Sequence, residues 1–137
     1  MTRKTRRTLV CALSALLLAA LAGASVASAL TSHTVNVLGH GSQTGIKLTA
    51  TYKGTPFGTC KMTGTLVIPD THQTWRCTRG SFKLIGHGTT GAANNAKGTW
   101  RIVRGSGTRK YRHISGKGTF AGKLSTGTFR YKGTAKY

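Results

Sequence analysis

Carboxylates are almost missing from this 137-residue chain, which has one Asp, no Glu and 21 Lys or Arg residues. At least two carboxylates are needed for a paired acid–base site, a carboxylate cage for Ca²⁺ or Mg²⁺, or a two-metal nuclease centre. A single one, Asp70, therefore excludes these three classes of site. The formal net charge of +20 instead predicts attraction to polyanions.

Proline and cysteine are also scarce, with two and three residues, whereas glycine occurs 19 times. Hydrophobic residues make up 38% of the chain, which is enough to form a folded core. This composition argues against a disordered cationic tail. The length fits one domain.

The first 29 residues have the three-part pattern of a secretory signal peptide. Basic residues at positions 3, 4, 6 and 7 precede an apolar run over 9–22, and Ala27-Ser28-Ala29 is an A-x-A cleavage motif. We expect a helical signal peptide over 1–29, cleavage after Ala29, and a secreted, bacterial domain over 30–137. A transmembrane anchor is the alternative, but spanning a bilayer takes about 20 apolar residues. Cleavage would remove four basic residues and lower the net charge from +20 to +16.

Two cysteines, Cys60 and Cys77, remain after cleavage. An even pair in an exported domain predicts a disulfide. The alternative is a metal site with His72 or His87, but no C-x₂-C or H-x₃-H spacing is present. We therefore predict a disulfide, no metal and no cofactor.

The two cysteines fall on the core side of consecutive strands that we expect to be joined across a Pro69-Asp70 turn. Positions that face each other on antiparallel strands are close enough for a disulfide. With the turn at Pro69-Asp70 the register is off by about two residues, which a bulge or a wider turn could absorb.

Polar and apolar residues alternate over most of the mature chain, as in strands with one face in a core. Over 46–53, for example, Ile46, Leu48, Ala50 and Tyr52 are predicted to face inward. Glycine-rich segments, including 39–41, are expected to be turns. Short, evenly spaced strands predict a sandwich or a barrel, and glycines at core positions favour a closed antiparallel barrel. We expect eight strands, near 33–39, 46–53, 59–68, 72–79, 81–87, 97–104, 113–120 and 127–136.

Residues 98–120, GTWRIVRGSGTRKYRHISGKGTF, resemble the allene oxide cyclase and dirigent type of barrel. In that family a strand runs into a glycine-rich turn with a Gly-Thr-x-x-Tyr element and then into a Gly-x-Gly-Thr-aromatic strand. The resemblance covers 97–137 closely and implies a calycin-type, eight-stranded antiparallel barrel with an apolar cavity. The plant members use carboxylates in that cavity, and no position here matches them, so no catalytic residue is predicted. The expected cavity-lining residues are Tyr52, Trp75, Trp100, Phe129 and Tyr131.

Basic residues are expected to dominate the outer face. They lie on the polar side of the strands or in the turn after residue 102: Lys47, Lys61, Arg76, Arg101, Arg104, Arg109, Lys110, Arg112, Arg130 and Lys132. Such a field attracts polyanions without reading base sequence. The expected partners are teichoic acid, anionic lipid and extracellular DNA, bound non-specifically.

Three functional hypotheses follow. The leading hypothesis is a secreted or cell-wall-associated, non-enzymatic barrel that associates with anionic envelope or extracellular polymers. The alternative is a carrier of a small apolar ligand held in the barrel, or a cyclase-like enzyme acting on one. A cationic toxin is the third, but a closed barrel without an exposed apolar face would argue against it.

Overall fold

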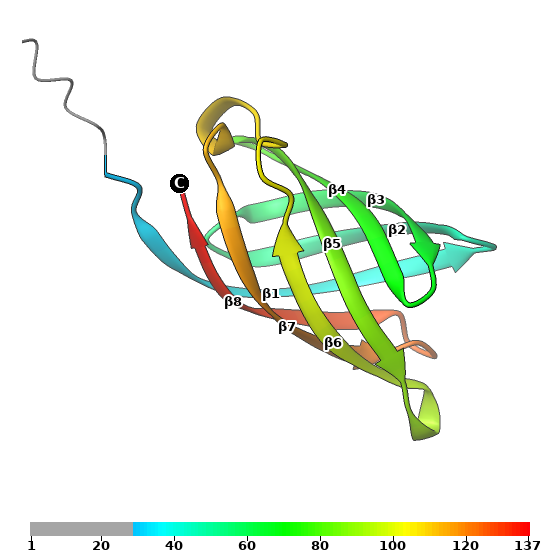
Figure 1. The fold of residues 1–137 in the computed structure, drawn as a ribbon. Coiled ribbons are helices and arrows are strands. Elements are labelled where there is room, and N and C mark those ends of the chain that lie inside the picture. The colour runs from blue at the N-terminus through cyan, green and yellow to red at the C-terminus, as the bar shows by residue number, and fades with distance from the viewer. Residues whose placement is uncertain (1–28) are drawn as a thin grey trace, which may run out of the picture.

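Eight antiparallel strands follow one another around a closed barrel (Figure 1). The computed structural model describes residues 29–137, so the predicted signal peptide lies outside the described residues except for Ala29. Within this part of the chain, no helix is long and apolar enough to cross a membrane. The strands are β1 (Ser32–Thr44), β2 (Lys47–Thr55), β3 (Gly58–Val67), β4 (Asp70–Cys77), β5 (Gly80–Thr90), β6 (Asn95–Ile102), β7 (Ser115–Lys123) and β8 (Thr128–Lys136).

Two short 3₁₀ helices lie in the loops. The helix η1 (Ala92–Asn94) joins β5 to β6, and η2 (Arg109–Tyr111) lies between β6 and β7. Pairing of β1 with β8 closes the barrel. The predicted all-β class, the eight strands and the closed antiparallel barrel are thus confirmed.

The inward and outward faces alternate along each strand, as the sequence pattern predicts. Val35, Val37, Tyr52, Cys60 and Trp75 are among the buried residues of one hydrophobic core. Ile46 is a correction, because its side chain is 63% exposed instead of facing the core. It lies in the turn between β1 and β2, beyond the last paired residue of either strand, so the alternation no longer governs it.

The predicted turn at 39–41 is also corrected, because β1 continues through it to Thr44. Gly39 pairs with Tyr52 and Gly41 with Ala50 in the ladder between β1 and β2. A Cβ atom at Gly39 would collide with the Tyr52 ring. Glycine at this position therefore makes room for an aromatic side chain from the neighbouring strand.

Aromatic rings fill the barrel near the end that the β2–β3 turn and η2 close. Tyr52 stacks on Trp75 with ring centroids 4.4 Å apart, and Phe82 lies on the other side of Trp75 at 5.8 Å. Phe57, from the β2–β3 turn, packs against Phe82 and Tyr111. This cluster closes one end of the barrel with apolar side chains.

Cys60 and Cys77 form the predicted disulfide, at directly opposite positions of β3 and β4. Their Cα atoms are 4.1 Å apart. The expected register offset does not occur, because Val67 pairs with Asp70 and the turn is centred on Ile68 and Pro69. Asp70 is therefore the first residue of β4 and not part of the turn.

Reduction of this disulfide is expected to lower the free energy of unfolding by about 3 kcal/mol, the value for closing a loop of about 15 residues. The two cysteines are 17 positions apart in the sequence. Urea unfolding with and without reductant measures the change, and a C60A/C77A variant should match the reduced protein. Two reactive thiols in the unfolded, unreduced protein would contradict the bridge.

Candidate polyanion-binding surface

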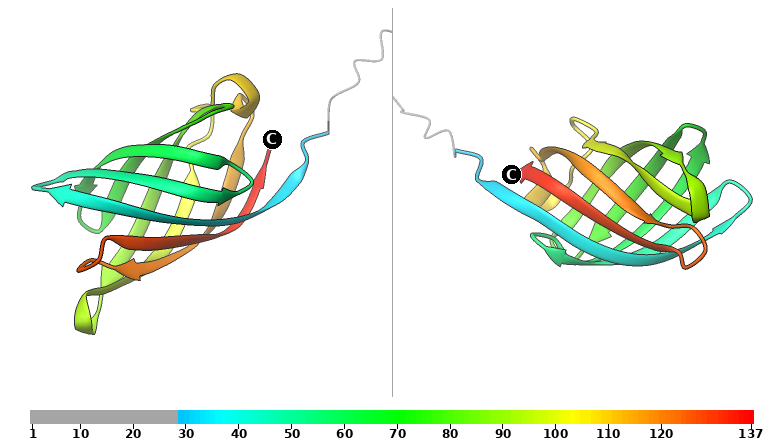
Figure 2. Two further views of the ribbon diagram at one scale, coloured as in Figure 1. Left: turned by 180° about the vertical axis from the view of Figure 1, so that it is seen from behind. Right: turned by 90° about the horizontal axis from the view of Figure 1, so that it is seen from below.

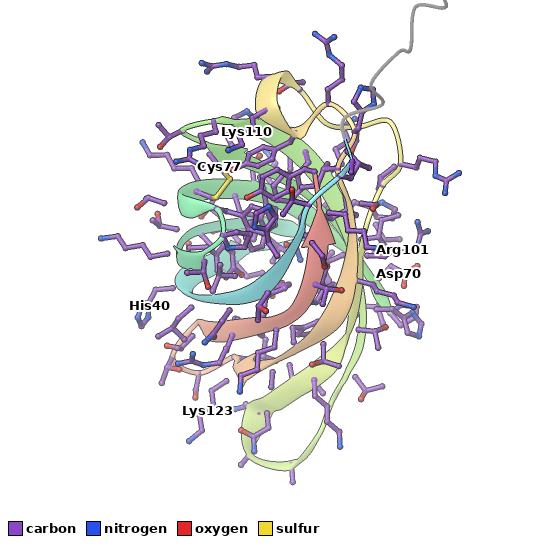
Figure 3. The ribbon with its side chains drawn as sticks, turned by 90° about the vertical axis from the view of Figure 1, so that its left-hand side faces the viewer. His40, Asp70, Cys77, Arg101, Lys110 and Lys123 are labelled. Atoms are coloured by element: carbon purple, nitrogen blue, oxygen red, sulfur yellow. A yellow bond between two sulfur atoms is a disulfide. The ribbon has the colours of Figure 1, made fainter. Side chains whose placement is uncertain are left out.

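All 17 Lys and Arg residues of the described chain are exposed. The ten predicted surface residues are among them, on strands and at one barrel end. Lys47, Lys61, Arg76, Arg101, Arg130 and Lys132 lie on the strands, and Arg104, Arg109, Lys110 and Arg112 lie between β6 and β7. Figure 3 shows the spread, with Lys110 at one end, Lys123 at the other and Arg101 on the wall.

The connection between β6 and β7 is held against the start of β5 by hydrogen bonds. The Val103 amide donates to the Lys83 carbonyl at 2.9 Å, and the Thr108 amide donates to the Ser81 carbonyl at 2.9 Å. The Ser106 hydroxyl accepts a bond from the Lys83 amide at 3.0 Å. These bonds order a segment that would otherwise be a long surface loop.

Tyr111 packs into the core and so holds the β6–β7 connection in place. Its side chain is fully buried and packs edge-on against Phe57, Phe82 and Tyr137. Burial raises the pKa of its phenol. The residues on either side of this anchor, Lys110 and Arg112, are therefore held at the barrel end and point to solvent.

A fifth basic residue joins the four of this connection. The Lys110 amide donates to the Arg79 carbonyl at 3.2 Å, which places the turn between β4 and β5 beside η2. The Lys110 ammonium lies 5.7 Å from the centre of the Tyr137 ring. We call this group the basic cap: Arg79, Arg104, Arg109, Lys110 and Arg112.

On the barrel wall, cations face one another across neighbouring strands. Lys61 pairs with Arg76 between β3 and β4, and Arg101 pairs with Lys117 between β6 and β7. Like charges directly opposite each other destabilise a sheet. An anion placed between two such side chains would remove this repulsion.

Protein carboxylates do not neutralise these charges. Within residues 29–137 the carboxylate of Asp70 contacts one basic side chain, His87, with 2.6 Å between Oδ1 and Nδ1. Arg76 donates instead to the Thr63 hydroxyl and Arg130 to the Asn36 carboxamide oxygen, both of which are neutral. The outer surface therefore has an uncompensated positive field.

Four of the five predicted cavity-lining residues pack against one another, and the fifth, Phe129, packs against Phe120. Tyr52, Trp75, Trp100 and Tyr131 are buried, and Phe129 is half-buried. Tyr131 lies edge-on to Tyr52 and Trp75, with centroids 5.2 and 5.3 Å away. Burial raises the pKa of the Tyr52 and Tyr131 phenols above the ordinary value.

Gln73 is a buried polar residue that the sequence reasoning missed. Its side-chain nitrogen donates to the Tyr131 hydroxyl at 3.0 Å, and its side-chain oxygen accepts a bond from Trp75 Nε1 at 2.9 Å. A polar residue at an inward position of β4, two residues before Trp75, was the available signal. The polar atoms of Trp75 and Tyr131 are thus already paired within the core.

Metal-ligand side chains do not cluster in the described chain. Across 29–137, no group of three His, Cys, Asp or Glu side chains is placed to hold a metal ion. Cys60 and Cys77, the two residues of the alternative metal site, are joined to each other.

One family model matches the chain. It is described as a protein of unknown function (DUF3224) and covers residues 64–132, which is half of the chain and extends from β3 into β8. No curated protein and no solved structure gives a match.

Proposed function

The chain belongs to the DUF3224 family, whose description assigns no function, and we propose that it is a secreted, non-enzymatic binding protein for anionic polymers. Its contact surface is the basic outer face of the barrel. The partners are the anionic polymers and surfaces outside a bacterial cell: teichoic acid, anionic lipid headgroups and extracellular DNA. Binding is non-specific and uses phosphate groups.

The observation that carries this proposal is positive charge without compensation by protein carboxylates. Solubility alone requires a modest net charge of either sign. Here basic residues lie at both barrel ends and around the wall, and two pairs of them repel each other across strands. Polyanions would stabilise this arrangement by neutralising it.

The experiment compares two variants with unmodified protein in binding to polyphosphate and to DNA of random sequence. The first variant replaces four residues of the basic cap by Gln, at Arg104, Arg109, Lys110 and Arg112. Each lost phosphate contact should weaken binding to both polymers alike and reduce the salt slope by about 1. We expect a loss of about tenfold or more for the four changes together.

The control variant carries Thr51→Ala on the outer face of β2 and Thr65→Ala on the outer face of β3, which changes polarity without changing charge. Its affinity should equal that of the unmodified protein. Unchanged affinity in the four-residue variant, or a loss confined to one DNA sequence, would refute a non-specific basic contact surface.

A carrier function is the second candidate. It is supported by the closed eight-stranded barrel and by its resemblance to the allene oxide cyclase and dirigent type. Leu48, Leu66 and Phe129 occupy inward positions and are only half-buried, so the end opposite the basic cap could accept an apolar molecule. Asp70 is at an outward position and bonded to His87, so a carrier is favoured over a cyclase. Native mass spectrometry of the secreted protein tests for a bound ligand.

A further inference from the structure

Four hairpin turns form the barrel end opposite the basic cap, and backbone hydrogen bonds link each turn to a neighbouring strand or turn (Figure 2). This rim is therefore an ordered ring. The linking bonds run from Leu66 to Ile46 at 2.8 Å, from Gly88 to Pro69 at 3.1 Å, from Leu124 to Asn94 at 2.9 Å and from Gly41 to Gly127 at 2.8 Å, each from amide to carbonyl.

Aliphatic side chains project from this rim into solvent. Ile46 is 63% exposed, Val67 55% and Ile68 84%. The hydrogen bond between Leu66 and Ile46 places the β1–β2 and β3–β4 turns side by side, so the three side chains belong to one region. We call Ile46, Val67 and Ile68 the aliphatic tip.

The aliphatic tip is unusual for this surface. The outer strand positions beside it carry Thr and Lys, as at Lys47, Thr49 and Thr65. Leu124, on the β7–β8 turn of the same rim, is 44% exposed. Leu38, on the wall of β1, is also exposed but lies between Lys53 and Arg130, and single exposed apolar residues are common on protein surfaces. Grouped exposed aliphatic residues instead indicate a contact with another apolar phase.

The charges around the tip are those that favour anionic headgroups. Lys47 follows Ile46 directly, and Lys123 precedes Leu124 on the same rim. The carboxylate of Asp70 is bonded to His87. Exposed apolar groups flanked by lysines combine the two forces that hold proteins at anionic membranes, apolar burial and headgroup attraction.

We propose that the barrel docks on an anionic phospholipid bilayer by inserting the aliphatic tip between the headgroups. Lys47 and Lys123 stay at the level of the phosphates, and the basic cap at the far end faces away from the membrane. This inference rests on the proposed function and names one partner of it, the lipid surface. The objection to a cationic toxin rests on a barrel without an exposed apolar face, whereas the tip exposes three aliphatic side chains.

The shape of the tip favours lipid over a protein partner. A stable protein interface needs about 800 Å² of complementary surface on each side. The tip consists of two neighbouring turns that project from the barrel, with aliphatic residues and no aromatic anchor. A fluid headgroup layer adapts to such a projection, whereas a rigid partner would need a matching socket.

The first experiment measures sedimentation with vesicles of phosphatidylcholine containing phosphatidylglycerol, beside binding to soluble polyphosphate. The variant carries Ile46→Thr, Val67→Thr and Ile68→Thr, which keep β-branched side chains on the turns. We expect its vesicle affinity to fall by about tenfold or more while its polyphosphate affinity is unchanged. The matched control, Leu38→Thr, alters an exposed leucine on the wall of β1 and should leave both affinities unchanged.

A second measurement places a reporter on the tip. In an Ile68→Trp variant, the added fluorescence should shift to shorter wavelength with vesicles and be quenched by lipids brominated on their acyl chains. Trp75 and Trp100 are buried in the barrel, so the unmodified protein serves as the background for this signal.

The outcomes separate the two proposals. Normal vesicle binding by the triple Thr variant, or no quenching at position 68, overturns the aliphatic tip even if polyphosphate still binds. If the unmodified protein does not bind polyphosphate, the proposed function is overturned instead. If the unmodified protein sediments as a dimer and the triple Thr variant as a monomer, the tip binds a second copy of the chain. That result would also overturn the lipid contact.

Discussion

Raising the salt concentration from about 50 to about 200 mM is expected to weaken binding of this barrel to polyphosphate by about 10³-fold or more. Each lysine or arginine that neutralises a phosphate releases a condensed counterion, so affinity falls steeply with salt. A loss of this size corresponds to roughly 6–10 phosphate contacts. The described chain exposes 17 basic side chains on a small barrel, so even partial coverage supplies that number.

Fluorescence anisotropy with labelled polyphosphate at several salt concentrations measures this slope. Double-stranded DNA of random sequence should give a comparable slope, and a neutral polysaccharide should show no binding at any salt. An affinity that stays nearly constant across the series would eliminate the basic outer face as the binding surface.

Replacing Trp75 by alanine is expected to lower the free energy of unfolding by about 3–5 kcal/mol. The side chain is 1% exposed, and its ring lies between those of Tyr52 and Phe82. Truncation would leave a cavity in the centre of the aromatic cluster and remove the donor that pairs with the Gln73 oxygen. Since a whole domain is stabilised by about 5–15 kcal/mol, this loss is a large fraction of the total, and the urea concentration at the unfolding midpoint should fall markedly.

Urea unfolding followed by circular dichroism measures this loss. Trp75→Phe keeps an aromatic ring in the stack and should retain most of the stability. Leu38→Ala, on the outer wall, should change it by less than about 0.5 kcal/mol. A loss below about 1 kcal/mol for Trp75→Ala would show that the interior tolerates a cavity at this position, which would favour the carrier function.

Much of the fold could be predicted from the sequence, because period-two alternation fixes which side chains face inward. The inward positions of Tyr52, Cys60 and Trp75 followed from it, and with them the disulfide. The extent of β1 did not follow. Glycines at 39 and 41 could end a strand or make space within it. The outcome depends on Tyr52 and Ala50, which face them on the neighbouring strand. Position along one strand does not carry that information.

The basic residues of the outer surface were predictable in the same way, but the grouping of five of them into the basic cap was not. Outward positions of strand lysines and arginines follow directly from the alternation. The basic cap depends instead on hydrogen bonds between the β6–β7 connection and residues twenty or more positions earlier, such as Ser81 and Lys83. Arg79 joins the cap only through this packing, and the sequence has no local signal for it. Gln73 was missed because its partner Tyr131 is 58 residues away.

The facing cations Lys61 with Arg76 and Arg101 with Lys117 connect the stability of the barrel to its surroundings. Their repulsion acts only in the folded chain, where the strands hold them opposite each other. A polyanion that binds the native state therefore shifts the folding equilibrium by mass action. The same charges that attract a partner make the free protein the less stable form. The barrel should therefore stay folded where polyanions are present. Away from them it should unfold, and be cleaved by proteases, more readily.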